Sequence, residues 1–322
     1  MTTGFHYDPI YLEHQPGAGH PERPARLEAA IAHLREQAWF DTLTPIAGRA
    51  AALEWIHTIH APQYVARAEQ ACSAGQAYLD VQDVGISARS YHAAVHAAGA
   101  AMALADEVVA RRVDNAFALM RPPGHHAEAS LALGFCLFNN AAVMARYLQR
   151  EHGLDKILVL AWDVHHGNGP QHSFESDPSV MYVSLHQYPF YPGTGAVSET
   201  GTGAGAGATL NCPMAAGSGD AQYQQAFMER VLPAVNAFKP DAVVLSAGFD
   251  AHKDDPLAQM SLSTQCYAWM TQRMLEVADQ HAAGRVISLL EGGYDLHALS
   301  DCVATHVAGL SGHGTDVTAP QS

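Results

Sequence analysis

Four short, almost continuous apolar runs in this chain each lead directly into polar or glycine-rich residues. The runs are residues 116–120, 158–161, 242–246 and 286–290. Long stretches of helical character separate most of them, a pattern typical of parallel strands that are buried on both faces of a sheet. We therefore expect one α/β domain with a mostly parallel, multi-stranded sheet flanked by helices. In open α/β sheets the ligand binds outside the carboxyl ends of the strands, and the polar residues would gather there.

Length and composition fit such a domain. With 322 residues, of which 48% are hydrophobic, the chain can bury a large core. Helices are predicted for three stretches, which are residues 90–112, residues 220–238 beginning at an Asp cap, and residues 263–283 before a glycine. We place the domain at residues 1–310. The polar stretch 311–322 contains Gly and Pro, and we expect it to be a flexible, frayed tail.

Asp163 and His165 follow the run 158–161, and Asp250 follows the run 242–246. Side chains of an extended strand alternate between faces, so Asp163 and His165 would point to the same side and could share one cation. Such a pair on its own is more often a hydrogen-bonded structural pair than a metal site. Together with Asp250 it offers two oxygens and one nitrogen, which suit Zn²⁺ or Fe²⁺ and leave positions open for water and substrate. An open position is typical of a catalytic metal site.

The other two runs also end in residues that can carry out chemistry. His125 and His126 follow an Arg-Pro-Pro-Gly sequence, and Tyr294 follows Glu291 and two glycines. Each feature alone is more often structural, because a His pair can belong to a hydrogen-bonded loop and a Tyr can fill a surface turn. Their common place at the carboxyl ends of strands favours a catalytic interpretation.

These motifs, taken in order along the chain, resemble those of class II histone deacetylases and bacterial histone deacetylase-like amidohydrolases in the arginase-deacetylase superfamily. The segments that carry the resemblance are residues 19–27, 121–127, 162–169, 191–195, 246–251 and 291–294. The resemblance spans about residues 5–310. Several separate motifs in the same order make it specific.

The resemblance implies zinc-dependent hydrolysis of acyl-lysine side-chain amides, either acetyl or another short acyl group. The positions that match the zinc ligands are Asp163, His165 and Asp250. His126 matches the base that takes a proton from the metal-activated water, and one imidazole of the pair with His125 would return a proton to the departing amine. Tyr294 matches the hydroxyl that stabilises the oxyanion.

One position departs from the family pattern. Two residues before the first zinc ligand the family usually has a second Asp, and this chain has Ala161. His125 thereby loses the carboxylate that would fix its tautomer and favour its charged form. Loss of an orienting group of this kind commonly costs about 10- to 100-fold in activity or metal affinity. Asn168, beside the second imidazole, matches the class II pattern.

The resemblance also implies sites for monovalent cations such as potassium. Ser184 and Leu185 match the inner site, from which Ala161 removes one ligand. The positions that match the outer site are Phe174, Asp177 and Val180.

A narrow channel for the acyl-lysine stem is implied as well. Phe135 and Tyr191 match its aromatic walls, although the second wall is usually Phe. Leu257 matches a gatekeeper that is acidic in relatives selecting cationic acetylpolyamines, so the uncharged gate argues against a polyamine preference.

Further channel positions are less specific. Gly134 and Gly293 belong to the expected lining, and Asp83, or alternatively Asp80, lies where a rim residue in relatives accepts hydrogen bonds from the substrate backbone. Arg26 matches a buried arginine near a pocket through which released acetate leaves. The alternative for Arg26 is a helix charge that faces solvent.

Three other functions are weighed against a lysine deacylase. An amidohydrolase for small acetylated amines needs an acidic pocket residue or an occluding dimer loop. A dinuclear manganese ureohydrolase of the arginase type would need Asp in place of Gly167 and His252. A catalytically weak acyl-lysine binding protein is suggested by Ala161, but it would have no need of Tyr294 and the two imidazoles.

Charge and cysteine content limit partners and location. A net charge of −15, from 17 basic and 32 acidic residues, disfavours binding to nucleic acid or to anionic membranes and could attract basic peptides. The expected partner is an acyl-lysine peptide or protein, or a small acylated amine, and a homo-oligomer remains open. Five cysteines without metal-type spacing fit a reducing cytoplasm. No signal peptide or membrane span is predicted.

Overall fold

Eight strands form one sheet in the order β2-β1-β3-β8-β7-β4-β5-β6, and every neighbouring pair is parallel. The computed structural model describes residues 1–314. The strands are β1 Thr3–Tyr7, β2 Thr44–Pro45, β3 Asn115–Leu119, β4 Ile157–Ala161, β5 Val180–Gln187, β6 Thr209–Met214, β7 Ala242–Ala247 and β8 Val286–Leu290. The predicted single α/β domain with a parallel sheet is confirmed.

The four apolar runs of the sequence are the four central strands β3, β8, β7 and β4. Every residue of these strands is buried. Helices cover both faces of the sheet, so neither side of a central strand meets water, and the alternation typical of a half-exposed strand is absent.

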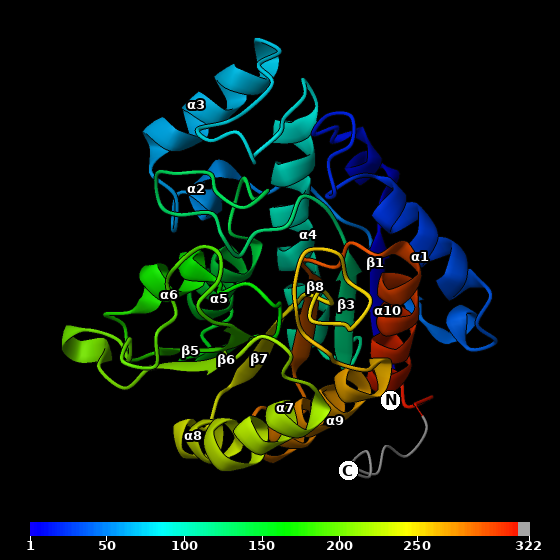
Figure 1. Ribbon diagram of the computed structural model, residues 1–322, viewed down its shortest axis with the longest axis vertical. Helices are drawn as coiled ribbons and strands as arrows, with labels where there is room; N and C mark the ends of the chain where they lie inside the picture. The colour runs from blue at the N-terminus through cyan, green and yellow to red at the C-terminus, as the bar shows by residue number, and fades with distance from the viewer. Residues whose placement is uncertain (315–322) are drawn as a thin grey trace.

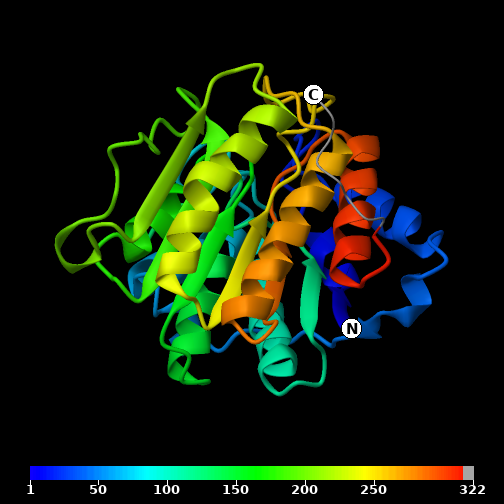
Figure 2. The same ribbon diagram turned by 90° about the horizontal axis from the view of Figure 1, so that it is seen from below.

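Two layers of helices enclose the sheet (Figures 1 and 2). On one face α4 (Ser90–Val109) packs against β3 and α5 (Asn140–Arg150) against β4. On the other face α9 (Thr264–His281) packs on β7 and β8, and α10 (Leu296–Leu310) lies between α9 and α1 (Ala25–Arg35). The remaining helical elements are α2 Leu53–Ile56, α3 Pro62–Ser73, α6 Asn168–Phe174, α7 Asp220–Ala226, α8 Leu232–Phe238, the 3₁₀ turns Pro9–Glu13, Phe40–Thr42 and Gly203–Gly205, and the π turn Phe227–Val231.

The three predicted helices are present, with differences at their ends. The stretch 220–238 is helical throughout, but a π turn joins α7 to α8. Its N-cap is Gly219, which corrects the predicted Asp cap. The carboxylate of Asp220 instead accepts hydrogen bonds from the backbone N–H and hydroxyl of Ser263 (2.9 and 2.6 Å), the N-cap of α9. Asp220 therefore ties the starts of two neighbouring helices together, a contact that depends on packing between helices.

Beyond α10, Ser311 is buried and residues 312–314 are exposed. Residues 311–314 form a turn, and the ring of His313 stacks on Trp39 with centroids 6.0 Å apart. Residues 315–322 of the expected tail lie outside the described residues. Within residues 1–314 no helix combines the length and the apolar character needed to cross a membrane.

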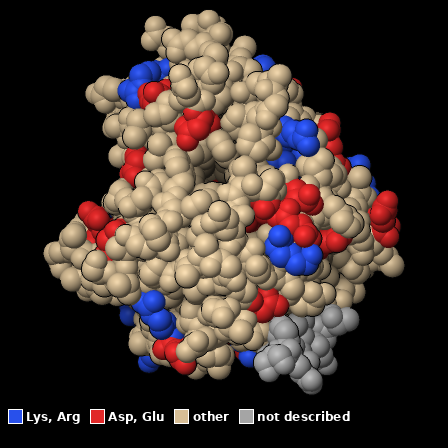
Figure 3. All heavy atoms as spheres, viewed as in Figure 1, with Lys and Arg blue, Asp and Glu red and all other residues tan. Residues whose placement is uncertain are grey.

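The segments that follow β3, β4, β7 and β8 hold the predicted functional residues. Because these strands are parallel neighbours, their carboxyl ends meet at the same edge of the sheet. Figure 3 shows a hollow near the centre of the face drawn in Figure 1, with acidic side chains around it.

Candidate active site

Asp163, His165 and Asp250 meet at the carboxyl ends of β4 and β7. Nδ1 of His165 lies 3.1 Å from Oδ1 of Asp163 and 3.1 Å from Oδ2 of Asp250. The sequence analysis attributed the closeness of Asp163 and His165 to the alternation of side chains along a strand. That reason is wrong, because β4 ends at Ala161 and both residues lie in the bend that follows. The bend itself is held by the N–H of His165, which donates to Oδ1 of Asp163 (2.9 Å).

Backbone N–H groups fix the two carboxylates. Gly292 donates to Oδ2 of Asp163 (2.8 Å), and Val164 donates to Oδ1 of Asp250 (2.7 Å). A Cβ atom on Gly292 would lie 2.3 Å from Oδ2 of Asp250, so only glycine allows the backbone to approach this closely. The carboxylates are thus set in place by the loops around them.

The electrostatics of these three residues suit a cation. Burial would raise the pKa of Asp163, but the imidazoles of His125 and His165 hold it well below its usual range. Burial and the charge of Asp163 raise the pKa of Asp250. Burial alone would lower the pKa of His165, yet its hydrogen bonds to both carboxylates raise it to about 10. The His165 imidazole is thus hydrogen-bonded to both of these fully buried carboxylates.

The donor atoms fit a divalent metal. One ligand atom from each of Asp163, His165 and Asp250 lies within 4.8 Å of the other two. Two carboxylate oxygens and one imidazole nitrogen are a set that Zn²⁺ or Fe²⁺ accepts with positions left open. A divalent ion would add positive charge beside these two buried carboxylates.

His126 adjoins this cluster as a neutral base. Burial, then the neighbouring His125 and His165, lower its pKa well below 6.5. Its Nδ1 lies 2.8 Å from Oδ1 of Asn168, and its ring centroid lies 5.9 Å from that of His165. A neutral imidazole at this position can accept a proton.

His125 packs beside it with ring centroids 3.9 Å apart. Nε2 of His125 lies 3.8 Å from Oδ2 of Asp163. Its Nδ1 is buried and has no hydrogen-bond partner among residues 1–314. The family resemblance led us to expect that His125 lacks a carboxylate partner, because Ala161 occupies the usual Asp position.

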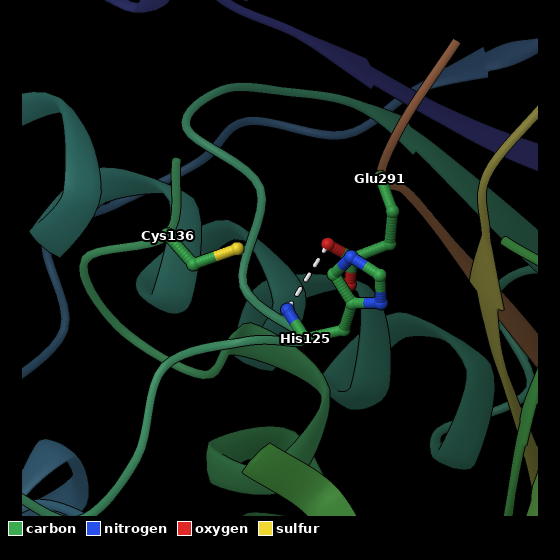
Figure 4. Close-up of side chains that lie close together, drawn as sticks. All are labelled: His125, Cys136 and Glu291. Carbon is green, nitrogen blue, oxygen red and sulfur yellow. Dashed lines mark hydrogen bonds between the residues drawn. The ribbon is translucent and has the colours of Figure 1, made fainter. Parts of the chain in front are cut away.

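Glu291 supports the loop that carries the two imidazoles, a role the sequence analysis missed. Its fully buried carboxylate accepts hydrogen bonds from the N–H groups of Gly124 (2.6 Å) and His125 (3.3 Å) and from the hydroxyl of Ser246 (2.8 Å). Figure 4 shows this carboxylate close to the backbone of His125, with Cys136 nearby. The sequence did offer one indication of this role, since Glu291 is a charged residue that directly follows the buried strand β8.

His125, Cys136 and Glu291 form a second group of possible ligand atoms within 4.8 Å of one another. Both oxygens of Glu291 already accept hydrogen bonds, and Sγ of Cys136 donates to the Gly134 carbonyl (3.1 Å). Burial raises the pKa of Cys136 well above its usual value, so the thiol keeps its proton. We assign this group to loop support.

Tyr294 stands on the loop after β8. Burial raises its pKa well above 10 although Arg26 opposes the shift, so the hydroxyl stays protonated and can donate. Arg26 lies over the Tyr294 ring, 4.9 Å from its centroid, and donates to the carbonyl oxygens of Gly293 (2.6 Å) and Glu291 (2.5 Å). Gly293 has φ +118°, which permits this turn.

Arg26 is fully buried and paired with Glu22 at 2.9 Å. The alternative that it is a helix charge facing solvent is therefore wrong. Its contacts are with the backbone of the Tyr294 loop and with the ring.

A pocket reaches His165 of the group formed by Asp163, His165 and Asp250. Its volume is about 140 Å³, and it is lined by Asp83, His126, Gly134, Phe135, His165, Tyr191, Leu257 and Tyr294. The expected channel residues thus lie together, except that Gly293 is not part of the lining. Phe135 has φ +68°, a rare conformation for a residue with a side chain, and its ring meets that of Tyr294 edge-on at 5.8 Å. Gly134 leaves no room for a Cβ, which would lie 2.1 Å from Cδ2 of His126.

The expected monovalent cation positions lie on and before β5. Ser184 and Leu185 are in the strand, but the Ser184 hydroxyl bonds with Nδ1 of His186 (2.9 Å). Phe174 ends α6, and Asp177 and Val180 follow. The Asp177 carboxylate accepts a hydrogen bond from Arg146 (2.6 Å). Both groups of residues remain predictions as cation sites.

Comparison with known proteins adds independent findings. A histone deacetylase domain matches residues 20–310. The chain is 39% identical to a protein of Archaeoglobus fulgidus named "Probable deacetylase", over 92% of this chain and 82% of that protein. It is 37% identical to human histone deacetylase 7 over 98% of this chain, which corresponds to 37% of that protein's length. The crystal structure of the HDA15 HD domain superposes with a TM-score of 0.92 at 39% identity, covering 98% of this chain and 90% of that one.

Proposed function

We propose that this chain, which belongs to the histone deacetylase family, uses a bound zinc ion to hydrolyse the side-chain amide of an acylated lysine. The observation that carries the proposal is the convergence of Asp163, His165 and Asp250 with His126 and Tyr294 at one pocket. A merely structural metal site would have no need of a neutral imidazole and a protonated phenol facing its open side.

The ion would be held by Asp163, His165 and Asp250. When bound, it would polarise the amide carbonyl and lower the pKa of a coordinated water. The rest of the chemistry falls to the protein's own side chains.

His126 would take the proton from the attacking water and hold it in the pocket. Its depressed pKa keeps it neutral and able to accept that proton at neutral pH. The proton then has to reach the departing amine, and either His126 or the adjacent His125 can deliver it over the short distance between their rings, which is 3.9 Å.

Tyr294 would donate a hydrogen bond to the carbonyl oxygen as that oxygen gains negative charge. Its hydroxyl keeps its proton because burial raises the pKa well above 10. Removal of one such donor typically costs about 10²- to 10³-fold in kcat.

The pocket favours an uncharged aliphatic stem. Phe135, Tyr191 and Leu257 supply apolar surface, and the only carboxylate of the lining is Asp83. A small space of about 140 Å³ between aromatic rings suits the extended butyl chain of a lysine side chain better than a bulky substrate.

Each of two alternative functions is supported by one specific observation. Asp83 could attract a cationic amine, which keeps a small acetylated amine as the alternative substrate. The partnerless Nδ1 of His125 fits a weakened enzyme that mainly binds acyl-lysine.

The deciding experiment measures how fast the zinc-loaded protein hydrolyses a panel of amides. The panel contains an acetyl-lysine peptide, longer-acyl or hydroxyacyl-lysine peptides, and acetylputrescine. We expect peptide turnover that is lost in Asp250→Ala and in Tyr294→Phe. Asp254→Ala is the matched control, because its side chain is 56% exposed and lies outside the cluster. Preference for acetylputrescine would support the small-amine alternative. Zinc binding without turnover of any amide would support a binding protein.

A further inference from the structure

A row of hydrogen-bonded side chains runs from His126 to the protein surface. Nδ1 of His126 lies 2.8 Å from Oδ1 of Asn168, and Nδ2 of Asn168 lies 2.5 Å from Oε1 of Glu128. The same Glu128 oxygen lies 2.7 Å from Nδ1 of His172, whose side chain is 41% exposed. Neither Glu128 nor His172 touches the pocket that holds the proposed zinc site.

The carboxylate determines how the Asn168 amide is turned. A carboxylate oxygen only accepts hydrogen bonds, so the Asn168 atom facing Glu128 must be the NH₂ group. The second N–H of that group points to the backbone carbonyl of His126 (3.0 Å), which is also only an acceptor. The amide oxygen of Asn168 is therefore left for Nδ1 of His126.

That orientation in turn selects one tautomer of His126. Because the Asn168 oxygen can only accept, Nδ1 of His126 must carry the proton. Nε2 then has a free lone pair and can take a proton in the pocket. Rotation of the amide by half a turn would present NH₂ to Nδ1 and would favour the tautomer with its proton on Nε2, which cannot act as a base.

Glu128 is itself firmly placed. Its backbone carbonyl accepts from Nδ1 of His60 (2.8 Å), and its N–H donates to the carbonyl of Leu131 (2.9 Å). His60 must donate through Nδ1, because its Nε2 accepts from the N–H of Asn139 (2.8 Å). Burial lowers the pKa of His60 to about 4, so this anchor stays neutral near neutral pH.

We propose that Glu128 is a positioning residue that fixes the Asn168 amide and, through it, the base tautomer of His126. The inference rests on the proposed function, since it needs His126 to act as the proton acceptor. Glu128 touches neither the pocket nor the expected metal ligands, and its effect would pass through Asn168 alone.

The test compares removal of Glu128 in two backgrounds. In Glu128→Ala we expect kcat on the preferred amide to fall about 10-fold with KM unchanged, the lower end of the effect of removing an orienting partner. Glu128→Gln should recover most of the rate, because its amide oxygen can still accept from Asn168. In an Asn168→Asp background both side-chain oxygens only accept, so no amide orientation remains to be fixed. Glu128→Ala then also removes the repulsion between two neighbouring carboxylates, so it should cause no further loss of kcat.

An equal loss of kcat in both backgrounds would show that Glu128 acts only on the local structure and would overturn the inference. Unchanged kcat in Glu128→Ala would overturn it as well. A second measurement is independent of turnover: ¹⁵N NMR of the intact protein, with the His126 signals assigned by their loss in His126→Gln. The wild type should show protonated Nδ1, and Glu128→Ala should shift the tautomer population toward Nε2–H. If no amide is hydrolysed yet the tautomer shifts, the proposed function fails while the orientation by Glu128 stands.

Discussion

The hydroxyl of Tyr191 donates a hydrogen bond of 3.0 Å to Oδ2 of Asp83, and both residues line the pocket. The other carboxylate oxygen of Asp83 is buried and has no hydrogen-bond partner among residues 1–314. The family resemblance places Phe at the position of Tyr191, and Phe has no hydroxyl. The hydroxyl of Tyr191 therefore links this side of the channel to the carboxylate of Asp83. One oxygen of Asp83 is thus held by the Tyr191 hydroxyl at the pocket, and the other is buried.

Tyr191→Phe tests that tether. Without the hydroxyl, Asp83 can turn away from the mouth, and we expect KM for an acyl-lysine peptide to rise about fivefold, equivalent to about 1 kcal/mol for one hydrogen bond to a charged group at a partly exposed site. We expect kcat to change little, because the proton-transfer residues are untouched. Tyr188→Phe is the control, since it removes a hydroxyl from the same segment outside the pocket lining. A fall in kcat at constant KM would contradict this explanation.

The fold and the meeting of Asp163, His165 and Asp250 were predictable because they depend on local pattern. Strands buried on both faces need apolar residues at every position, as in residues 157–161, and parallel neighbours bring their carboxyl ends to one edge. Residues that directly follow such strands, including Asp250 and Tyr294, therefore had to lie near one another. The motifs of the family assigned each of them a role.

Contacts between side chains from distant segments were not predictable in this way. Arg26 reaches the carbonyls of Glu291 and Gly293 only because α1 packs near the loop after β8, more than 260 positions along the chain. The bond between Asn168 and Glu128 spans 40 positions and depends on the direction of an amide. No spacing rule in a single sequence encodes such a rotamer choice.

Zinc should stabilise the folded protein through the three ligands. Binding to the folded state alone raises the free energy of unfolding by about 2.7 kcal/mol at a free zinc concentration one hundred times Kd. Urea unfolding with and without zinc should show this gain in the wild type and in Asp254→Ala, but not in Asp250→Ala. A gain of equal size in Asp250→Ala would place the ion elsewhere.

His306 makes stability depend on pH. It is fully buried between Thr271 and Ser288, with ring nitrogens 2.6 and 2.8 Å from their hydroxyls, and burial lowers its pKa to about 3. In the unfolded chain it protonates near its ordinary value of about 6.5, so protons favour the unfolded state between these values and stability falls as pH falls. Between pH 6.5 and pH 5 this residue should cost about 2 kcal/mol.

The His306→Gln variant removes that titration. Urea unfolding of the metal-free proteins should show that the variant loses about 2 kcal/mol less than the wild type over the same pH interval. This comparison uses only the change in the free energy of unfolding with pH. A constant loss of packing energy caused by the substitution therefore does not affect it. Parallel curves for the two proteins would show that His306 is not kept neutral by the fold.

Ala161→Asp would return the carboxylate that His125 lacks. Ala161 is fully buried in β4, in register with Ser184 of β5 and Ser246 of β7. We expect kcat to rise about 10-fold, because a carboxylate would orient the ring of His125 and stabilise its charged form. The larger side chain in a packed strand should at the same time lower the free energy of unfolding by about 1–3 kcal/mol.

Ala161→Asn separates charge from shape, since it has nearly the same volume as Asp and also accepts a hydrogen bond. If the negative charge matters, Asn should give the same loss of stability with a much smaller gain in kcat. Equal gains from Asp and Asn would mean that His125 needs only an acceptor for its buried Nδ1. A loss of kcat in both variants, measured on correctly folded, zinc-loaded protein, would mean that this chain has adapted to Ala161 and that the partnerless nitrogen is part of its working state.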